Sequence, residues 1–139
     1  FIYDLNFTLK EELEYFRDIK VTNVNQINDS ILLASTTGSG FIIYNENTKH
    51  SVSYNRSHNF IANNIYSLVI YNNALWLGTE KGIVNCNISS LLKGAPDFQF
   101  ITKNNGLVND KINFLTILKN ELWAFSDEGF VKFPLSDIR

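Results

Sequence analysis

Residues 75–83 read Leu-Trp-Leu-Gly-Thr-Glu-Lys-Gly-Ile, and residues 122–130 repeat this pattern as Leu-Trp-Ala-Phe-Ser-Asp-Glu-Gly-Phe. In both copies a tryptophan and a glycine are six positions apart, and the longer segments 65–87 and 112–134 can be aligned at a constant offset of 47. Apolar residues alternate or cluster over a few positions and are then interrupted by Asn, Asp, Gly or Ser, which is typical of short strands joined by turns. The sequence therefore predicts a repeating protein built from strands.

A looser third copy lies upstream of these two. There, Ile-Leu-Leu-Ala-Ser at 31–35 precedes Gly-Phe-Ile-Ile-Tyr at 40–44. We align Leu32 with the tryptophan of the later copies, which leaves two extra residues in the turn. The first four residues of the chain resemble residues 42–45, so we expect the chain to begin within a repeat.

The repeat length predicts β-propeller blades. The steps between the last large residues of successive copies are 41, 42 and 47 residues, which fit the roughly 40 to 50 residues of propeller repeats. Each period also holds about four strand-like runs, the content of one blade. We therefore predict an all-β fold with about three blades of four antiparallel strands, a partial propeller over residues 1–139. The approximate repeats are 1–6, the end of a blade, and then 7–48, 49–90 and 91–139.

Three blades leave the predicted propeller incomplete. A closed ring has about four to eight blades, and each apolar face of a blade must be covered by a neighbour. Either the chain is an excerpt of a longer polypeptide, or two or more copies assemble edge to edge. The beginning within a repeat favours the excerpt. Further propeller blades or a second copy of the chain are therefore the expected partners.

Near the N-terminus, a short helix is an alternative to strands. Leu9, Leu13 and Phe16 are four and three positions apart, which suits the apolar face of a helix. Isolated short helices are marginal in water. We therefore expect strand structure here as in the rest of the chain.

Composition and charge exclude several classes of protein. Twelve Lys and Arg against fourteen Asp and Glu give a net charge of −2 without a basic run, so we expect no nucleic-acid partner. Apolar clusters are far shorter than the roughly 20 residues of a membrane-spanning helix, so we expect no membrane contact within this piece. The only cysteine, Cys86, cannot form an internal disulfide, and it replaces large apolar residues of the other copies, which indicates a buried position.

We find no group of side chains suited to catalysis, a metal or a cofactor. Two histidines, His50 and His58, lie in a polar stretch without the cysteines or acids of a zinc site. Asp127 and Glu128 precede a glycine in a turn, where Asp commonly bonds to the backbone. The acidic cluster at 11–14 is flanked by basic residues, as on a solvated face. Because no nucleophile with a base and no paired carboxylates stand out, we expect a non-catalytic region.

A ligand site should use residues that differ between copies, because packing positions repeat. Trp76 and Trp123 occupy the same position in successive copies, which indicates packing rather than sugar stacking. The nonrepeating segments 48–60 and 89–97 are the better candidates. The predicted ligand-binding set is Tyr54, Arg56, His58 and Phe60.

The segment 64–87 resembles the two-component regulator propeller repeat. That motif reads as a Leu-Trp-Ile/Leu-Gly-Thr strand, a tight turn and a Gly-Leu strand, which corresponds to residues 75–83. Residues 102–107 are similar to the family's linker, which ends in a Gly-Leu pair before the next inner strand. The resemblance covers nearly the whole chain and is strongest in the last two copies. Phe125 where the family usually has Gly, and Leu32 where it has Trp, are departures from the motif.

This resemblance implies a periplasmic sensor region of a hybrid two-component histidine kinase of the Bacteroides type. In such receptors, blades precede an immunoglobulin-like domain, one span of the inner membrane and cytoplasmic kinase modules. They commonly respond to oligosaccharides and control transcription of the genes for using them. The resemblance thus implies a sensor with an oligosaccharide ligand. The alternative is a structural or protein-interaction propeller that binds no small molecule, because propellers host many functions.

Overall fold

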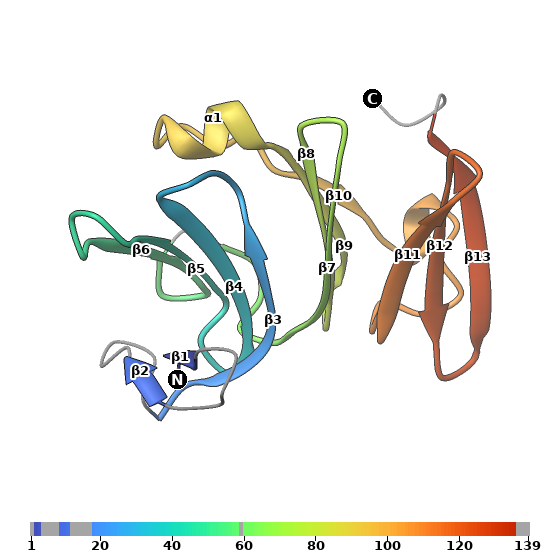
Figure 1. Ribbon diagram of the computed structural model, residues 1–139. Coiled ribbons are helices and arrows are strands. Elements are labelled where there is room, and N and C mark those ends of the chain that lie inside the picture. Colours follow the sequence, from blue (N-terminus) through green and yellow to red (C-terminus); the bar gives the residue numbers. More distant parts are fainter. Residues whose placement is uncertain (1, 4–8, 12–17, 59, 136–139) are drawn as a thin grey trace.

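The computed structural model describes residues 2–3, 9–11, 18–58 and 60–135. Its strands form three antiparallel sheets that lie side by side, together with a two-stranded ribbon near the N-terminus (Figure 1). The predicted N-terminal strand is confirmed for 9–11, whereas residues 12–17 of the alternative helix lie outside the described residues. No helix in the described part of the chain is both long and apolar enough to cross a membrane.

The sheets follow the chain in order. The ribbon pairs β1 (Ile2–Tyr3) with β2 (Leu9–Glu11). The first sheet holds β3 (Lys20–Gln26), β4 (Ile31–Thr37), β5 (Phe41–Asn45) and β6 (Ser51–Tyr54). The second sheet holds β7 (Ile65–Tyr71), β8 (Ala74–Thr79), β9 (Gly82–Asn87) and β10 (Gln99–Ile101). The third sheet holds β11 (Phe114–Leu118), β12 (Glu121–Ser126) and β13 (Gly129–Pro134). Two short helices, α1 (Ile88–Leu92) and η2 (Lys103–Asn105), lie in the connections on either side of β10.

The sheets are offset by one strand from the predicted sequence repeats. β6 and β10 are the outer strands of the first and second sheets, but they fall in the repeats 49–90 and 91–139. The strand-like run at 98–102 therefore pairs with β9 of the second sheet, although it belongs to the last sequence period. The predicted repeat boundaries describe the period of the sequence and stay a prediction. The boundaries of the sheets differ from them by one strand.

A hydroxyl group closes the same turn in all three sheets. At the end of the second strand of each sheet, a threonine or serine donates a hydrogen bond to the carbonyl of a glycine at the beginning of the third strand or directly before it. The pairs are Thr36 with Gly40, Thr79 with Gly82, and Ser126 with Gly129, at 2.7, 2.9 and 3.0 Å. All three glycines have positive φ, which residues with a Cβ rarely adopt. The turn therefore marks equivalent positions in the three copies.

This turn corrects the alignment of the first copy. Counted back from the hydroxyl residue, Leu33 rather than Leu32 is the counterpart of Trp76. Strand pairing agrees, because Leu33 is opposite Ile43 as Trp76 is opposite Asn85. The first copy therefore has one extra turn residue instead of two. The expected alignment was wrong by one position because consecutive leucines at 32 and 33 fit the tryptophan position equally well.

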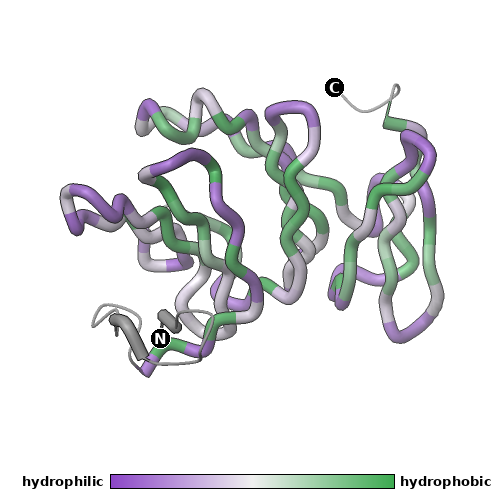
Figure 2. Tube along the Cα trace, viewed as in Figure 1, coloured by the Kyte–Doolittle hydropathy of each residue, from purple (hydrophilic) through white to green (hydrophobic). Residues whose placement is uncertain are grey.

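An apolar core fills each junction between sheets. At the first junction, side chains of the first sheet pack on those of the second: Leu33, Phe41 and Ile43 on Leu68, Leu75, Leu77, Val84 and Cys86. At the second junction, side chains of the second sheet pack on those of the third: Trp76 and Ile83 on Ile112, Leu115, Leu122 and Ala124. The predicted packing role of Trp76 and the buried position of Cys86 are confirmed. Figure 2 shows hydrophobic residues along the strands and hydrophilic ones at many of the turns.

Candidate functional site

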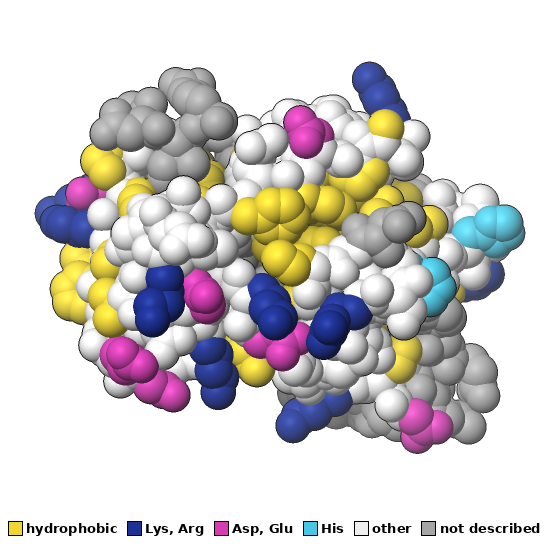
Figure 3. All heavy atoms as spheres, turned by 180° about the vertical axis from the view of Figure 1, so that it is seen from behind, with side chains coloured by type: hydrophobic (Ala, Val, Ile, Leu, Met, Phe, Trp, Pro, Cys, Tyr) yellow, Lys and Arg dark blue, Asp and Glu magenta, His cyan; other side chains and the backbone are white. Residues whose placement is uncertain are grey.

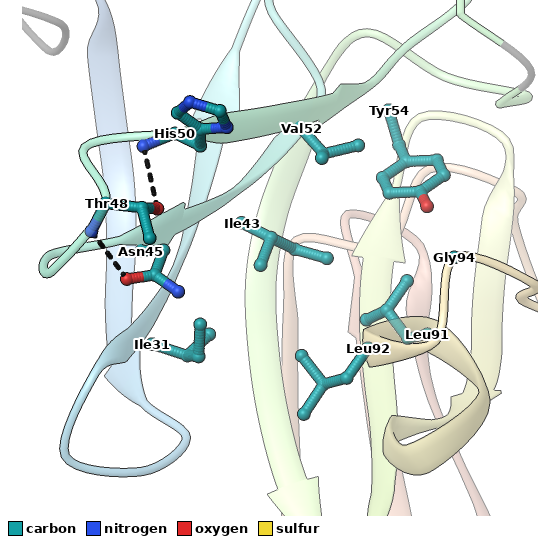
Figure 4. A pocket seen from close by; sticks show the side chains of 10 residues that line it. All are labelled: Ile31, Ile43, Asn45, Thr48, His50, Val52, Tyr54, Leu91, Leu92 and Gly94. Atoms are coloured by element: carbon teal, nitrogen blue, oxygen red, sulfur yellow. Dashed lines mark hydrogen bonds between the residues drawn. The ribbon is translucent and has the colours of Figure 1, made fainter.

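A pocket opens between the outer part of the first sheet and helix α1 of the second (Figure 4). Its volume is about 220 Å³. Apolar side chains form most of its wall: Ile31, Ile43, Val52, Tyr54, Leu91 and Leu92. Asn45, Thr48 and His50 lie together at one end (Figure 4). The pocket therefore has a long apolar wall and one polar end.

The two nonrepeating segments singled out by the sequence meet at this pocket. The segment 48–60 contributes β6 and, from the polar end, Thr48 and His50, and the segment 89–97 contributes part of α1 and Gly94. Helix α1 is held in place by its cap, because the Asn87 side chain accepts a hydrogen bond from the backbone N–H of Ser90 at 3.0 Å. The buried side chain of Leu91 fixes the helix on the first junction. A ligand here would touch two sheets at once.

Local hydrogen bonds fix the polar end of the pocket. Asn45 Oδ1 accepts from the backbone N–H groups of Asn47 and Thr48, at 2.9 and 3.1 Å. The Thr48 hydroxyl accepts from the backbone N–H of His50 at 3.3 Å. These bonds shape the turn between β5 and β6 and leave the His50 ring exposed. The imidazole ring of His50 and the amide NH₂ of Asn45 are therefore the groups best placed to bind polar atoms of a ligand.

The structure separates the four residues of the predicted ligand-binding set. Tyr54 and Phe60 are buried, and their rings pack with Phe41 and Phe98 at centroid distances of 4.9–5.8 Å. Arg56 and His58 are exposed on the turn after β6, where His58 Nδ1 lies 3.0 Å from Asn55 Oδ1. Of the four residues, only Tyr54 lines the pocket. The role of the four residues in ligand binding therefore stays a prediction.

His50 and Tyr54 are the titratable side chains among the residues that line the pocket, and the Cys86 thiol lies in the same core cluster as Tyr54. Burial raises the pKa of the Cys86 thiol above its ordinary value, so that the thiol stays protonated and unreactive at neutral pH. Within the described ranges, no group of three or more His, Cys, Asp or Glu side chains could hold a metal ion.

The Glu80 carboxylate ties the turn after β8 to the beginning of the second sheet. It accepts hydrogen bonds from the backbone N–H groups of Asn63 and Asn64, at 3.1 and 3.3 Å, and from the side-chain amide of Asn64 at 3.1 Å. Burial by itself raises the pKa of this carboxyl, but the hydrogen bonds outweigh burial and hold the pKa below its ordinary value. The ionised carboxylate therefore stabilises the fold.

We expect Glu80→Gln to destabilise the protein at neutral pH, with a difference that fades in acid. Because the folded-state pKa is the lower one, the stabilisation is present above the unfolded pKa, about 4.3, and is lost as the pH falls through the folded pKa. Urea unfolding of both proteins between pH 3 and pH 7 measures this. Glu128→Gln, on an exposed residue of the corresponding turn in the third sheet, is the control. A difference independent of pH would contradict the assignment.

Comparison with known proteins identifies the fold. No protein-family model matches the sequence, and no curated protein does. The structure is similar to the extracellular domain of the candidate one-component system BT4673 from B. thetaiotaomicron, with a TM-score of 0.69 and 18% identity over 86% of this chain and 18% of that chain. It is also similar to the extracellular domain of the candidate hybrid two-component system BT3049 from the same bacterium, with a TM-score of 0.64 and 23% identity over 97% of this chain and 19% of that chain.

A designed protein shows the same arrangement of sheets. The computationally designed Ika4 protein matches 82% of this chain with a TM-score of 0.57 and 17% identity, over 65% of its own length. The chain has a β-propeller fold. The predicted likeness to the sensor propellers of hybrid two-component systems is confirmed in the fold. This chain spans less than a fifth of the length of each of the two bacterial proteins, both of which are extracellular domains.

Proposed function

We propose that this chain is part of the periplasmic, ligand-sensing propeller of a hybrid two-component histidine kinase. The observation that carries the proposal is the likeness of its fold, over 86–97% of the chain, to extracellular domains of bacterial signalling systems. In this proposal the propeller is non-catalytic. It belongs to an inner-membrane receptor whose kinase modules act on transcription.

The proposed signal is an oligosaccharide, and the proposed site is the pocket between the first two sheets. Sugar rings carry apolar C–H surfaces and polar hydroxyls, which match the apolar wall and the polar end formed by Asn45 and His50. Because α1 belongs to one sheet and β6 to the other, a bound ligand would favour one packing of the two sheets over another. Such a shift in packing is the proposed signal to the next domain.

A thermal-shift screen tests this proposal. A ligand that binds only the folded state raises the melting temperature in a concentration-dependent way. We expect one class of oligosaccharide in a panel to do so with the purified protein. We expect the His50→Ala variant to need at least a tenfold higher ligand concentration for the same rise in melting temperature. His58→Ala is the matched control, because His58 is also exposed but lies outside the pocket.

The outcomes separate the ligand from the site. A panel that leaves the melting temperature unchanged would contradict sugar sensing. A shift that His50→Ala leaves intact would keep sensing and overturn this pocket as the site. Loss of the shift in both histidine variants would point to a general disturbance of the segment 48–60.

The second candidate function is that of a docking propeller without a small ligand. Apolar side chains at the pocket rim favour it, because Val52 on the edge strand β6 and Leu92 on α1 are exposed. Figure 3 also shows hydrophobic side chains gathered near the middle of one face, with acidic and basic groups around them. Such areas are typical of protein interfaces. An unresponsive sugar panel on a folded protein would favour this function.

A further inference from the structure

The third sheet lies at one end of the row of sheets (Figure 1), and among the described residues no other sheet packs on its outer face, which is aromatic. Side chains at alternate strand positions share a face, and four rings lie on this one: Phe114, Trp123, Phe125 and Phe130. The Trp123 and Phe130 rings stack at a centroid distance of 5.4 Å, and Phe125 lies 5.6 Å from Phe130. Phe114 and Phe130 are each 53% exposed. We call these four residues the aromatic face.

The two internal junctions show what covers a face of this kind. Trp76 and Trp123 have the same register, because Trp76 is opposite Asn85 and Trp123 is opposite Lys132 in the next strand. In the second sheet this face is covered by the third sheet, and only 4% of Trp76 is exposed. In the first sheet the face with Leu33 is likewise covered by the second sheet. A further sheet is therefore the cover that the pattern indicates.

The aromatic face differs from the earlier ones at the beginning of its first strand. In the second sheet the paired residues there are Ser67 and Gly78, and in the third sheet they are Phe114 and Phe125. The Ser67 hydroxyl accepts a hydrogen bond from the backbone N–H of Leu115 at 3.0 Å. The small residues thus let the third sheet approach closely.

Gly78 shows how little room this approach leaves. A Cβ atom at Gly78 would lie 2.9 Å from Ile112 Cγ2 and 3.3 Å from Leu115 Cγ. At the aromatic face, Phe125 stands at the register position of Gly78, so that it adds a ring on the face where Gly78 leaves room for these two side chains. A sheet with an isoleucine and a leucine at the same positions would overlap with the rings or stand away from them, and either is costly in a close-packed interior.

We infer that the aromatic face docks a fourth sheet of the same propeller, one that carries Gly, Ala or Ser at two positions: in its first strand, where Leu115 lies in β11, and just before that strand, where Ile112 lies. At this junction the large side chains belong to the third sheet, which receives the next one, and the small side chains belong to the fourth sheet that packs on it. The junction is then filled without overlap. Face-to-face pairing of two copies would instead oppose rings with rings. This inference rests on the fold and not on the proposed ligand or signal.

Site-specific photo-crosslinking tests the occupant. The full-length protein is made in cells with p-benzoylphenylalanine in place of Phe130, illuminated, digested and analysed by mass spectrometry. We expect a crosslink to a strand of the same polypeptide with small residues at the two stated positions. The same probe in place of the partly exposed Phe100 on β10, outside the aromatic face, should not reach that strand. A crosslink to another copy, to another protein or to a strand with bulky residues there would overturn the inference, as would no crosslink.

A pair of serine variants tests the size matching. Phe114→Ser gives the third sheet the residue that the second has at Ser67. Leu118→Ser changes the same face at the other end of β11, and the two side chains are almost equally exposed, 53% and 52%. We expect the melting temperature of the full-length protein to fall clearly more for Phe114→Ser. Equal falls would overturn the size matching.

Discussion

Replacing Phe41 by alanine is expected to lower the free energy of unfolding by about 3–5 kcal/mol, the usual cost of truncating a buried phenylalanine. Its ring is fully buried and contacts the rings of Tyr54, Phe60 and Phe98 at centroid distances of 4.9, 5.2 and 6.2 Å. These partners come from the first sheet, from the loop before the second sheet and from the connection to β10. The variant would thus leave a cavity where three separate segments meet.

Urea unfolding followed by circular dichroism measures this loss. Phe100→Ala is the control, because that ring is 44% exposed on β10. We expect the control to cost about 1 kcal/mol, as for a partly buried ring. Similar losses for the two variants would show that the aromatic cluster contributes no more than an ordinary surface ring.

The strands could be predicted because their determinants are local. Alternation of apolar residues and the recurring turn place β8, β9, β12 and β13 within one or two residues. The register of the first copy could not be predicted in the same way. Leu32 and Leu33 are both compatible with the tryptophan position, and the hydrogen bond between Thr36 and Gly40 together with the strand pairing decides between them.

The site could be predicted in part. The rule that ligand positions should not repeat points to 48–60 and 89–97, which do meet at the pocket. Which side chains face the pocket depends on distant contacts, because Phe98 packs against Phe60 at 5.0 Å and helps to bury it. Ile31 and Asn45 lie in repeating strands, so that a search for nonrepeating residues misses them.

The aromatic face was visible in the sequence only as a departure from a motif. Phe125 stands where the repeat family usually has Gly, and the equivalent residue of the second sheet is Gly78. Sequence alone does not tell whether such a change is neutral. The contacts of Gly78 with the third sheet show that this position controls how closely two sheets approach.

Gly78→Phe is accordingly expected to lower the free energy of unfolding by about 3 kcal/mol, at the upper end for overpacking a core. The ring would meet the Ile112 side chain, and the Ile112 carbonyl lies 3.2 Å from the position of the added Cβ. Gly78→Ala should cost much less. Its methyl group would still lie 2.9 Å from Ile112 Cγ2, so that Ile112 must shift, but it adds far less volume than a ring, and alanine also restricts the unfolded chain. Val24→Phe, which adds a ring at an exposed position of β3, is the control for bulk in a strand.

A second substitution separates steric overlap from other causes. If the ring introduced by Gly78→Phe destabilises by meeting Ile112, then Gly78→Phe combined with Ile112→Ala should lose clearly less stability than the sum of the two single variants. Urea unfolding of the four proteins in this cycle gives the coupling energy directly. Additive losses would mean that the junction does not respond to the size of facing residues. A favourable coupling would show that bulk can move from the incoming sheet to the receiving one, which is the arrangement inferred for the aromatic face.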